Sequence, residues 1–206
     1  MDGLSMISLS LNGYTDIPNE KVAYVVTYLE MLEPPKVAAK PRGDITMERW
    51  DEVDIAAYRS LYREIGAEWL WFSRLQLSSE KLHTILDAPV TEIYSPVRDG
   101  RRLGILEINT AVDGEIEISF FGLVPDAIGD GLGRWLMMTG LEMAWSRPGI
   151  ERVWLHTCTG DSPQAVHFYQ ACGFKPYKRA IEVVDDPRND GLFSTETARH
   201  VPYLGV

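Results

Sequence analysis

The sequence has few cysteines, no long apolar run and no basic cluster, and each shortage excludes a class of protein. Cys158 and Cys172 are too few for a disulfide framework, and Cys172 shares a helical face with apolar neighbours, which favours packing over chemistry. No apolar run approaches the ~20 residues that cross a membrane, and no basic segment precedes an apolar stretch at the N-terminus. We therefore expect a soluble, cytoplasmic protein that is not exported and does not bind membranes.

Basic charge is also scarce, with 20 Lys and Arg against 30 Asp and Glu and a formal net charge of -10. Nucleic-acid binding needs a basic face to neutralise phosphates, so this balance argues against a nucleic-acid partner. It is compatible with a cationic acceptor such as an amine, although acidity commonly serves only solubility. With 206 residues and 45% hydrophobic content, the chain is long enough to form one domain over 1–206.

The most informative segment is 123–133, where an apolar strand ends at Pro125 and three alternating glycines, Gly129, Gly131 and Gly133, lead into a helical pattern. A glycine loop at a helix N-terminus exposes free N–H groups and allows an anion to come close. A plain strand-to-helix turn is the alternative interpretation. No Lys-Ser or Lys-Thr closes the loop, and the glycine spacing does not fit a dinucleotide fingerprint.

The segment resembles the acyl-CoA loop of the GNAT N-acyltransferases, which reads Gln/Arg-x-x-Gly-x-Gly/Ala after a strand that ends in a proline motif. Gly131 and Gly133 match this pattern, whereas Ile128 replaces the polar first residue and Asp130 stands where many relatives are basic. The resemblance implies that backbone amides and the helix dipole bind the pyrophosphate, and Arg134 could restore a positive charge.

A second block, 153–174, resembles the strand and helix that end in Asn-x-x-Ala-x-x-x-Tyr-x-x-x-Gly-Phe in the same family. Four of its residues match at that spacing, and Ser162 replaces the asparagine as a helix N-cap before Pro163. The matching residues are Ala165, Tyr169, Gly173 and Phe174. For both blocks together, the implied cofactor-binding residues are Leu123, Val124, Ile128, Gly129, Asp130, Gly131, Leu132, Gly133, Arg134, Ser162 and Tyr169.

Hydrophobic periodicity predicts the elements in the family's order: a strand over 22–32, two helices, three antiparallel strands, a helix, a strand, a helix and a last strand near 177–184. Asp99-Gly100 and Asp113-Gly114 indicate hairpins. The expected fold class is α/β (α+β), a mixed, mostly antiparallel sheet with helices on both faces. The family-like core covers about 20–184, and 185–206 is expected to be a loop or a swapped arm.

Amide formation on a thioester needs a base, because an amine resembling lysine has a pKa near 10.4 and is almost fully protonated at neutral pH. Glu117 lies at the offset from the loop where the histone-acetylating branch of the family has its catalytic glutamate. Glu107 and Glu115 are further candidates, and the alternative is that all three form a solvated sheet face. The resemblance also implies an oxyanion donor at the amide of Leu123, with Gly122 easing a local bulge.

The same resemblance makes Tyr169 the acid for the departing thiolate, whereas a buried tyrosine is otherwise a core residue. For the acceptor, an aromatic segment follows the first strand and either lines a pocket or seals the core. Its members are Trp50, Trp69, Trp71 and Phe72. The histidines His156 and His167 have no third ligand at metal-site spacing, so no metal is expected.

We therefore expect an acetyl-CoA-dependent N-acetyltransferase whose partners are acetyl-CoA and a primary amine of a small molecule or peptide. A catalytically silent acyl-CoA-binding module, another acyl donor and an alcohol acceptor are the alternatives. Because oligomers are common among relatives, a homodimer is one expected assembly.

Overall fold

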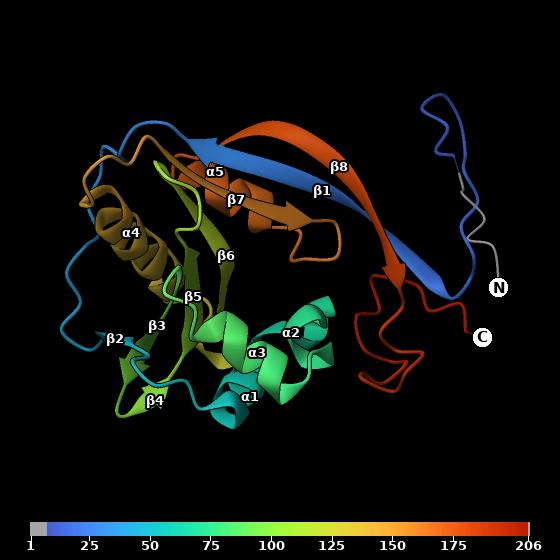
Figure 1. Cartoon of the computed structure of the whole chain (residues 1–206), viewed down its shortest axis with the longest axis horizontal. Helices are drawn as coiled ribbons and strands as arrows, with labels where there is room; N and C mark the ends of the chain where they lie inside the picture. Colours follow the sequence, from blue (N-terminus) through green and yellow to red (C-terminus); the bar gives the residue numbers. More distant parts are fainter. Residues whose placement is uncertain (1–7, 206) are drawn as a thin grey trace.

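The computed structural model describes residues 8–205, and its strands form one eight-stranded sheet with helices on both faces (Figure 1). The strand order is β2-β3-β5-β6-β7-β1-β8, and β4 pairs with β3. All pairings are antiparallel except that of β6 with β7. The strands are β1 Lys21–Met31, β2 Thr46–Arg49, β3 Thr91–Arg98, β4 Arg101–Arg102, β5 Gly104–Asn109, β6 Glu115–Leu123, β7 Arg152–Cys158 and β8 Lys175–Asp185. The helices are α1 Ile55–Gly66, η1 Ala67–Trp69, α2 Ser73–Gln76, α3 Ser79–Leu86, η2 Pro125–Ala127, α4 Leu132–Trp145 and α5 Ala165–Ala171.

The mixed, mostly antiparallel sheet and the helices on both faces confirm the expected fold class. Asp99 and Gly100 turn the chain with φ values of 51° and 77°, as the hairpin prediction requires. Ser78 caps α3 as expected from a serine before an apolar helical pattern, because its hydroxyl accepts a hydrogen bond from the Lys81 N–H at 3.2 Å. Helix α1 begins at Ile55 because the side chain of Asp54 accepts bonds from the first helical N–H groups.

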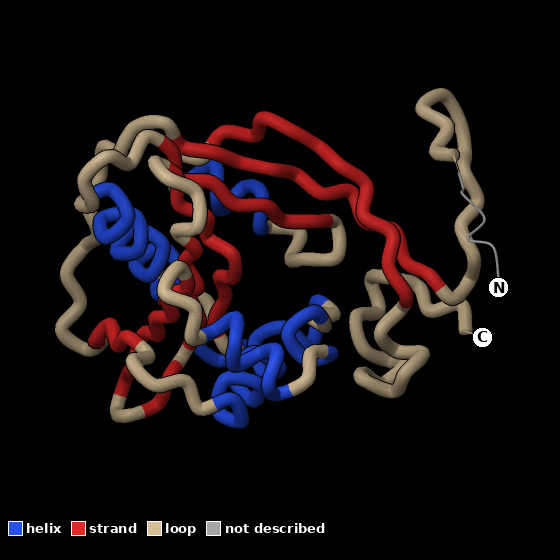
Figure 2. Tube along the Cα trace, viewed as in Figure 1, coloured by secondary structure: helices blue, strands red, loops and turns tan. Residues whose placement is uncertain are grey.

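The first strand was predicted correctly, but two features of its surroundings were not. A short strand, β2, follows it and pairs with β3, whereas β1 lies between β7 and β8 near the opposite edge of the sheet. Figure 2 shows β1 and β8 running side by side as a long twisted ribbon that extends beyond the helices. Sheet order is a tertiary property that strand periodicity does not encode.

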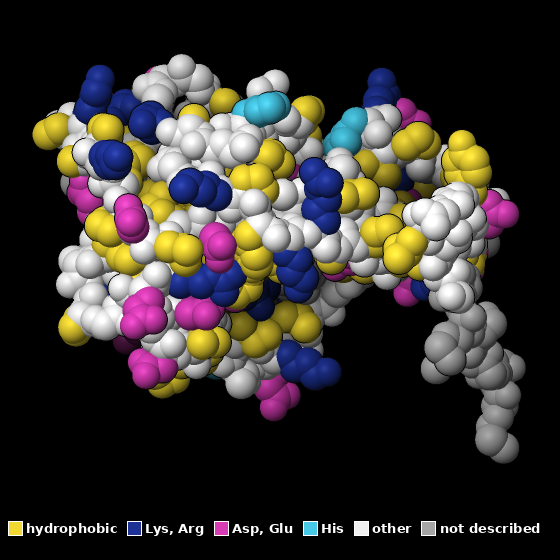
Figure 3. All heavy atoms as spheres, turned by 90° about the horizontal axis from the view of Figure 1, so that it is seen from above, with side chains coloured by type: hydrophobic (Ala, Val, Ile, Leu, Met, Phe, Trp, Pro, Cys, Tyr) yellow, Lys and Arg dark blue, Asp and Glu magenta, His cyan; other side chains and the backbone are white. Residues whose placement is uncertain are grey.

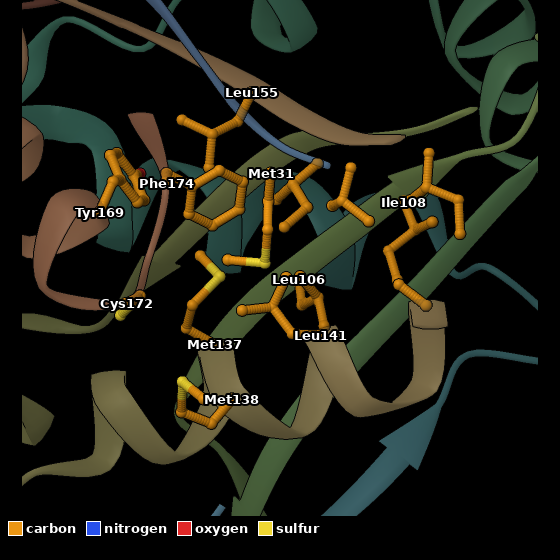
Figure 4. Packing of buried hydrophobic residues seen from close by; sticks show 14 of the residues in the cluster. Met31, Leu106, Ile108, Met137, Met138, Leu141, Leu155, Tyr169, Cys172 and Phe174 are labelled. Atoms are coloured by element: carbon orange, nitrogen blue, oxygen red, sulfur yellow. The ribbon is translucent and has the colours of Figure 1, made fainter. Parts of the chain in front are cut away.

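Two apolar clusters hold the helices against the sheet. On one face, α4 packs its buried side chains against β5, β7 and Phe174, with Cys172 buried among them as predicted (Figure 4). On the other face, α1 and α3 bury Tyr58, Tyr62 and Leu82 against β3 and β5. The sheet is therefore covered on both sides, and β6 and β7 pair only over the first residues of each strand.

The segment after β8 folds back onto the chain as a loop. Phe193 and Ala198 form a small cluster with Leu70, and Arg63 donates to the carbonyl of Leu192 at 2.9 Å. Of the two alternatives for the tail, the described residues up to 205 adopt the loop. Residue 206 and residues 1–7 of the expected domain lie outside the described residues.

Candidate active site

The glycine loop lies between β6 and α4, and its backbone exposes N–H groups. Gly129 and Gly131 have φ values of 112° and 83°, which favour glycine over other residues. A Cβ at either position would meet no atom within 4 Å, so the space above the loop is open. Among the described residues, the N–H groups of Gly129, Gly131 and Gly133 have no hydrogen-bond acceptor. The loop therefore has the free donors and the open approach that an anion needs.

Asp130 has a structural role that its acidic character obscured in the sequence. Its Oδ1 accepts a hydrogen bond from the N–H of Leu132, the first residue of α4, at 3.0 Å, and Arg98 and Arg42 approach its Oδ2 at 2.9 and 3.1 Å. The two hydrogen-bonded guanidinium groups lower the pKa of Asp130 to about 2, so its charge is balanced locally. Asp44 shares both arginines, at 2.8 Å from Arg98 and 2.9 Å from Arg42.

Sequence reasoning missed Arg42 and Arg98 as residues of this loop. They lie 88 and 32 positions before Asp130, and only the pairing of β2 with β3 brings both near the loop. Neither occupies a position in the glycine motif. No signal in the sequence could have selected them among 20 basic residues.

Ile128, Arg134 and Ser162, three other residues predicted to bind the cofactor, differ in their contacts. Ile128 is 66% exposed, and its backbone N–H donates to the Pro125 carbonyl at 3.3 Å. The guanidinium of Arg134 donates to the carbonyl of Ala171 at 3.0 Å, at the end of α5, so this arginine links the two helices. Ser162 does not cap α5, because the helix begins at Ala165 and the serine hydroxyl makes only a long 3.4 Å contact with the N–H of Gln164.

The amides of Leu123 and Val124, at the strand end before the loop, point in opposite directions. The N–H of Val124 donates to the Leu103 carbonyl at 3.0 Å, so it is directed towards β5. Strand amides alternate in direction, so the N–H of Leu123 points the other way, towards β7. Strand β7 pairs with β6 only over Glu115–Glu117. The Leu123 amide therefore points away from β5, whereas the Val124 amide is engaged with Leu103.

The bulge in β6 lies at Ser119 rather than beside Gly122. Ile108 pairs with Ile118 and Glu107 with Phe120, so Ser119 is the extra residue. At Gly122, a Cβ would lie 2.4 Å from Ile65 and 3.1 Å from Trp71. Glycine is therefore needed there for the close approach of α1 and the following aromatic connector.

The three candidate glutamates occupy different environments. Glu107 is 1% exposed, accepts a hydrogen bond from the Tyr58 hydroxyl at 2.7 Å and is ion-paired with Arg74. Glu115 is ion-paired with Arg152 at 3.1 Å. Glu117 is half-buried, and within residues 8–205 it has neither a hydrogen bond nor an ion pair. Glu117 is therefore the carboxylate that is free to accept a proton.

The pKa of Glu117 is raised above its ordinary value, first by burial and then by the nearby charge of Glu107, while His156 and Arg74 oppose the shift. Trp154 pairs with Glu117 in the parallel register, and β7 directs Val153 and Leu155 into the cluster beneath α4. Since strand side chains alternate, Trp154 and His156 lie on the other face, together with Glu117. A less acidic carboxylate is a better proton acceptor at neutral pH.

Tyr169 lies on α5 in an aromatic cluster that joins α5 to β6. Its ring centroid is 6.2 Å from that of Phe121 and 5.5 Å from that of Phe168, and its side chain is 9% exposed. Burial raises the pKa of its hydroxyl well above the ordinary value, so it remains protonated at neutral pH. Tyr169 is a core residue and also carries a proton that it could donate (Figure 4).

Two tryptophans of the aromatic segment that follows the first strand lie in different surroundings. Trp50 is buried and donates to Ser95 at 2.9 Å, which supports the core interpretation for that residue. Trp71 is half-buried, lies against Gly122 and donates to Asp161 at 3.1 Å, so it links the α1 side of the molecule to the β7–α5 loop. Within residues 8–205, we find no group of three or more metal-ligating side chains and no helix that could span a membrane.

Comparison with known families agrees with this geometry. The model of the GNAT acetyltransferase family matches residues 56–174, which include the glycine loop, Glu117 and the Tyr169 block. The chain belongs to the GNAT acetyltransferase family. The match begins in α1 and ends before β8, so β1 and the tail lie outside it.

Solved structures with the GNAT fold resemble the chain at low sequence identity. A protein of unknown function from Staphylococcus epidermidis is 15% identical with a TM-score of 0.57, and the match covers 81% of this chain and 63% of that one. A putative GNAT acetyltransferase from Novosphingobium aromaticivorans is 16% identical with a TM-score of 0.55, covering 83% and 69%. A GCN5-related N-acetyltransferase from Sphaerobacter thermophilus is 16% identical with a TM-score of 0.55, covering 79% and 51%.

This GNAT chain thus spans less than two thirds of the length of the first and third of these proteins. No curated protein matches its sequence. Acyl transfer is the activity of the family.

Proposed function

We propose that this GNAT protein transfers an acetyl group from acetyl-CoA to a primary amine of a small molecule or peptide, by direct attack in a ternary complex. The observation that carries the proposal is the carboxylate of Glu117, which has a raised pKa and no hydrogen bond or ion pair among residues 8–205, beside the short pairing of β6 with β7. In this proposal the N–H groups of the glycine loop bind the CoA pyrophosphate. Arg42 and Arg98 offset the acidic side chain of Asp130 at the same loop.

The proposed reaction removes two protons from the acceptor nitrogen and delivers one proton to the departing sulfur. Glu117 removes a proton from the ammonium group of the acceptor, and the amine lone pair attacks the thioester carbonyl carbon. The oxygen becomes an oxyanion that the Leu123 N–H stabilises. The attacking nitrogen loses its second proton to solvent, the carbon–sulfur bond breaks to leave the amide, and the thiolate takes a proton from Tyr169, which regains one from solvent.

The acceptor enters, in this proposal, from the sheet face that carries Glu117. Tyr28 and His156 lie there with ring centroids 5.5 Å apart, and Tyr28 and Trp154 with centroids 6.3 Å apart. Aromatic faces and an uncompensated carboxylate favour a cation. The free thiols of Cys158 and Cys172 agree with a cytoplasmic location.

The test is a turnover assay in which acetyl-CoA and a panel of primary amines are mixed with the protein, thiol release is followed, and the products are identified by mass. We expect amine-dependent thiol release with an equal amount of acetylated amine. Binding of acetyl-CoA without turnover across the panel would support the silent module. An ester product, or preference for a larger acyl group, would replace the acceptor or the donor in the proposal.

A further inference from the structure

Strand β8 forms one edge of the sheet, and the backbone groups along its outer side are available. It ends the strand order, and nearly all of its residues are exposed. The Asp186 N–H donates to the Glu20 carbonyl at 2.9 Å, and in the same register Tyr24 pairs with Glu182 and Val26 with Ala180. The even-numbered residues of β8 therefore direct their backbone N–H and C=O groups towards β1.

The odd-numbered residues of β8 direct their N–H and C=O groups outward. They are Arg179, Ile181 and Val183, and no strand among residues 8–205 pairs with them on that side. Consistent with this alternation, Val25 of β1 is bonded to Thr159 on the β7 side, with an N–H to hydroxyl distance of 3.1 Å. A long edge with free backbone groups is a template for strand addition.

Apolar side chains accompany this edge on one face of the ribbon. Val25 pairs with Ile181, and the two side chains are 44% and 49% exposed, with Val183 beside them at 45%. Figure 3 views the molecule from the side that carries the β1–β8 ribbon and shows hydrophobic and charged side chains interspersed there. This apolar patch is too small to form an interface by itself, so an interface here also needs hydrogen bonds to the outward N–H and C=O groups of β8.

The charges of β8 are arranged so that the strand complements itself. Its first half carries Lys175, Lys178 and Arg179, and its second half carries Glu182 and Asp185. If two copies run antiparallel around a two-fold axis at Ala180, Lys178 of each copy lies directly opposite Glu182 of the other. Among residues 8–205, neither Lys178 nor Glu182 has an ion-pair partner within the chain.

Other registers lose this match. If the two-fold axis lay at Arg179, the Arg179 side chains of the two copies would be opposite each other. If it lay at Glu182, the two Glu182 carboxylates would be opposite each other. The axis at Ala180 also pairs Arg179 with Ile181, both of which direct their backbone groups outward, as an antiparallel hydrogen-bonded pair requires. At this register the two copies of Ile181 are diagonal neighbours on one face. The bulge between Tyr28 and Leu29 and the missing N–H of Pro176 limit the ladder at its other end.

We propose that β8 is a homodimer interface, in which the β8 strands of two copies of this chain pair antiparallel around Ala180 and continue the sheet across the two-fold axis. The partner is a second copy because a two-fold axis satisfies every charge pair twice. This surface lies outside the glycine loop, so the proposal stands independently of the proposed function.

The experiment is sedimentation equilibrium of the full chain with charge-reversal variants. We expect the unmodified protein to dimerise, and Lys178→Glu and Glu182→Lys each to raise the dimer dissociation constant by about threefold to tenfold, because each places two like-charged pairs across the axis. The double variant exchanges both partners and is expected to recover the original constant. Lys36→Glu and Glu151→Lys, at exposed positions elsewhere, serve as charge-matched controls.

Three results would overturn the proposal. One is a monomer at every concentration, and another is a dimer that neither single variant weakens. The third is a double variant that stays as weak as the single variants, because the Ala180 register demands recovery. Circular dichroism spectra of each variant establish that the chain has folded.

Discussion

Glu107 and Glu117 lie on the same face of neighbouring strands, and their surroundings give them different roles. Each carboxylate oxygen of Glu107 has a partner, Arg74 on one and the Tyr58 hydroxyl on the other, which hold the side chain in place. Among residues 8–205, Glu117 has no such partner, and its pKa is raised. Strand alternation alone could not show that Glu107 is engaged by other side chains, since its partners Tyr58 and Arg74 lie far from it in the sequence.

Replacement of Glu117 by glutamine separates catalysis from stability. We expect Glu117→Gln to lower kcat/KM by about 100-fold or more, the usual scale of a lost general base. In the unmodified enzyme, kcat/KM is expected to rise with pH through an apparent pKa above 4.5, and the variant loses this acidic limb. Steady-state kinetics across pH measure both effects.

The same variant is expected to be more stable at neutral pH. A carboxyl whose pKa is raised by folding binds its proton more tightly in the folded state, so its ionisation costs stability as pH rises through 4.5 to the folded pKa. Glutamine removes this cost. A thermal midpoint that falls at neutral pH in Glu117→Gln would contradict the raised pKa.

Tyr169→Phe tests the proposed acid. Because a leaving-group acid acts in the transition state, we expect kcat to fall by about 100-fold while the affinity for CoA changes little. Tyr94→Phe is the matched control, since Tyr94 is equally buried but donates to Glu92 at 2.7 Å. Equal kcat values for Tyr169→Phe and the unmodified enzyme would remove Tyr169 from this role.

At the scale of elements, the glycine loop and α4 form the feature that sequence could predict most fully. The alternation of apolar residues and the three glycines are local signals, and the structure places free N–H groups at the predicted loop. The arginines around Asp130, the bulge at Ser119 and the place of β1 could not be predicted. Each depends on strand pairing between segments that are far apart in the chain.

The loop offers a controlled test because the chain has a second glycine with the same backbone conformation. Gly131 and Gly149 have φ values of 83° and 78°, and a Cβ at either meets no atom within 4 Å. We expect alanine at each to cost about 1 kcal/mol of unfolding free energy, the usual penalty of a left-handed conformation. Only Gly131→Ala should raise the Kd for acetyl-CoA, by about tenfold, because its new methyl group lies where the phosphates approach.

Calorimetric titration of both variants with acetyl-CoA measures this difference. Equal affinities for Gly131→Ala and Gly149→Ala would mean that the loop is an ordinary turn.

At the scale of the whole molecule, the tail ties the β1–β8 ribbon to the helical side. Arg188 is buried and pairs with Asp186 at 2.6 Å, and it donates to the carbonyls of Thr197 and Val201 at 3.1 and 2.9 Å. His200 lies 3.0 Å from the Gly160 carbonyl, beside the β7–α5 loop. The tail therefore borders the side of the sheet from which we expect the acceptor to enter.

Arg188→Met is expected to release this tail, because it leaves Asp186 buried without its partner at a cost of about 3 kcal/mol. Limited proteolysis should then cut after β8 while the core remains intact, and the acceptor KM should change more than the Kd for acetyl-CoA. Arg199→Met, at an exposed ion pair with Glu196, is the control. A tail that resists proteolysis in Arg188→Met would show that the apolar contacts of Phe193 suffice to hold it.

The most direct test of the acyl-CoA site is an amide ¹H–¹⁵N NMR titration of the protein with acetyl-CoA. Our account predicts the largest shift changes at Gly129, Gly131 and Gly133, together with Leu123, whose N–H points away from β5. The amide of Val124, which is bonded to Leu103, should change less. Shift changes confined to the surface between Trp50 and Arg101, with the glycine amides unmoved, would contradict the placement of acyl-CoA at the N-terminus of α4.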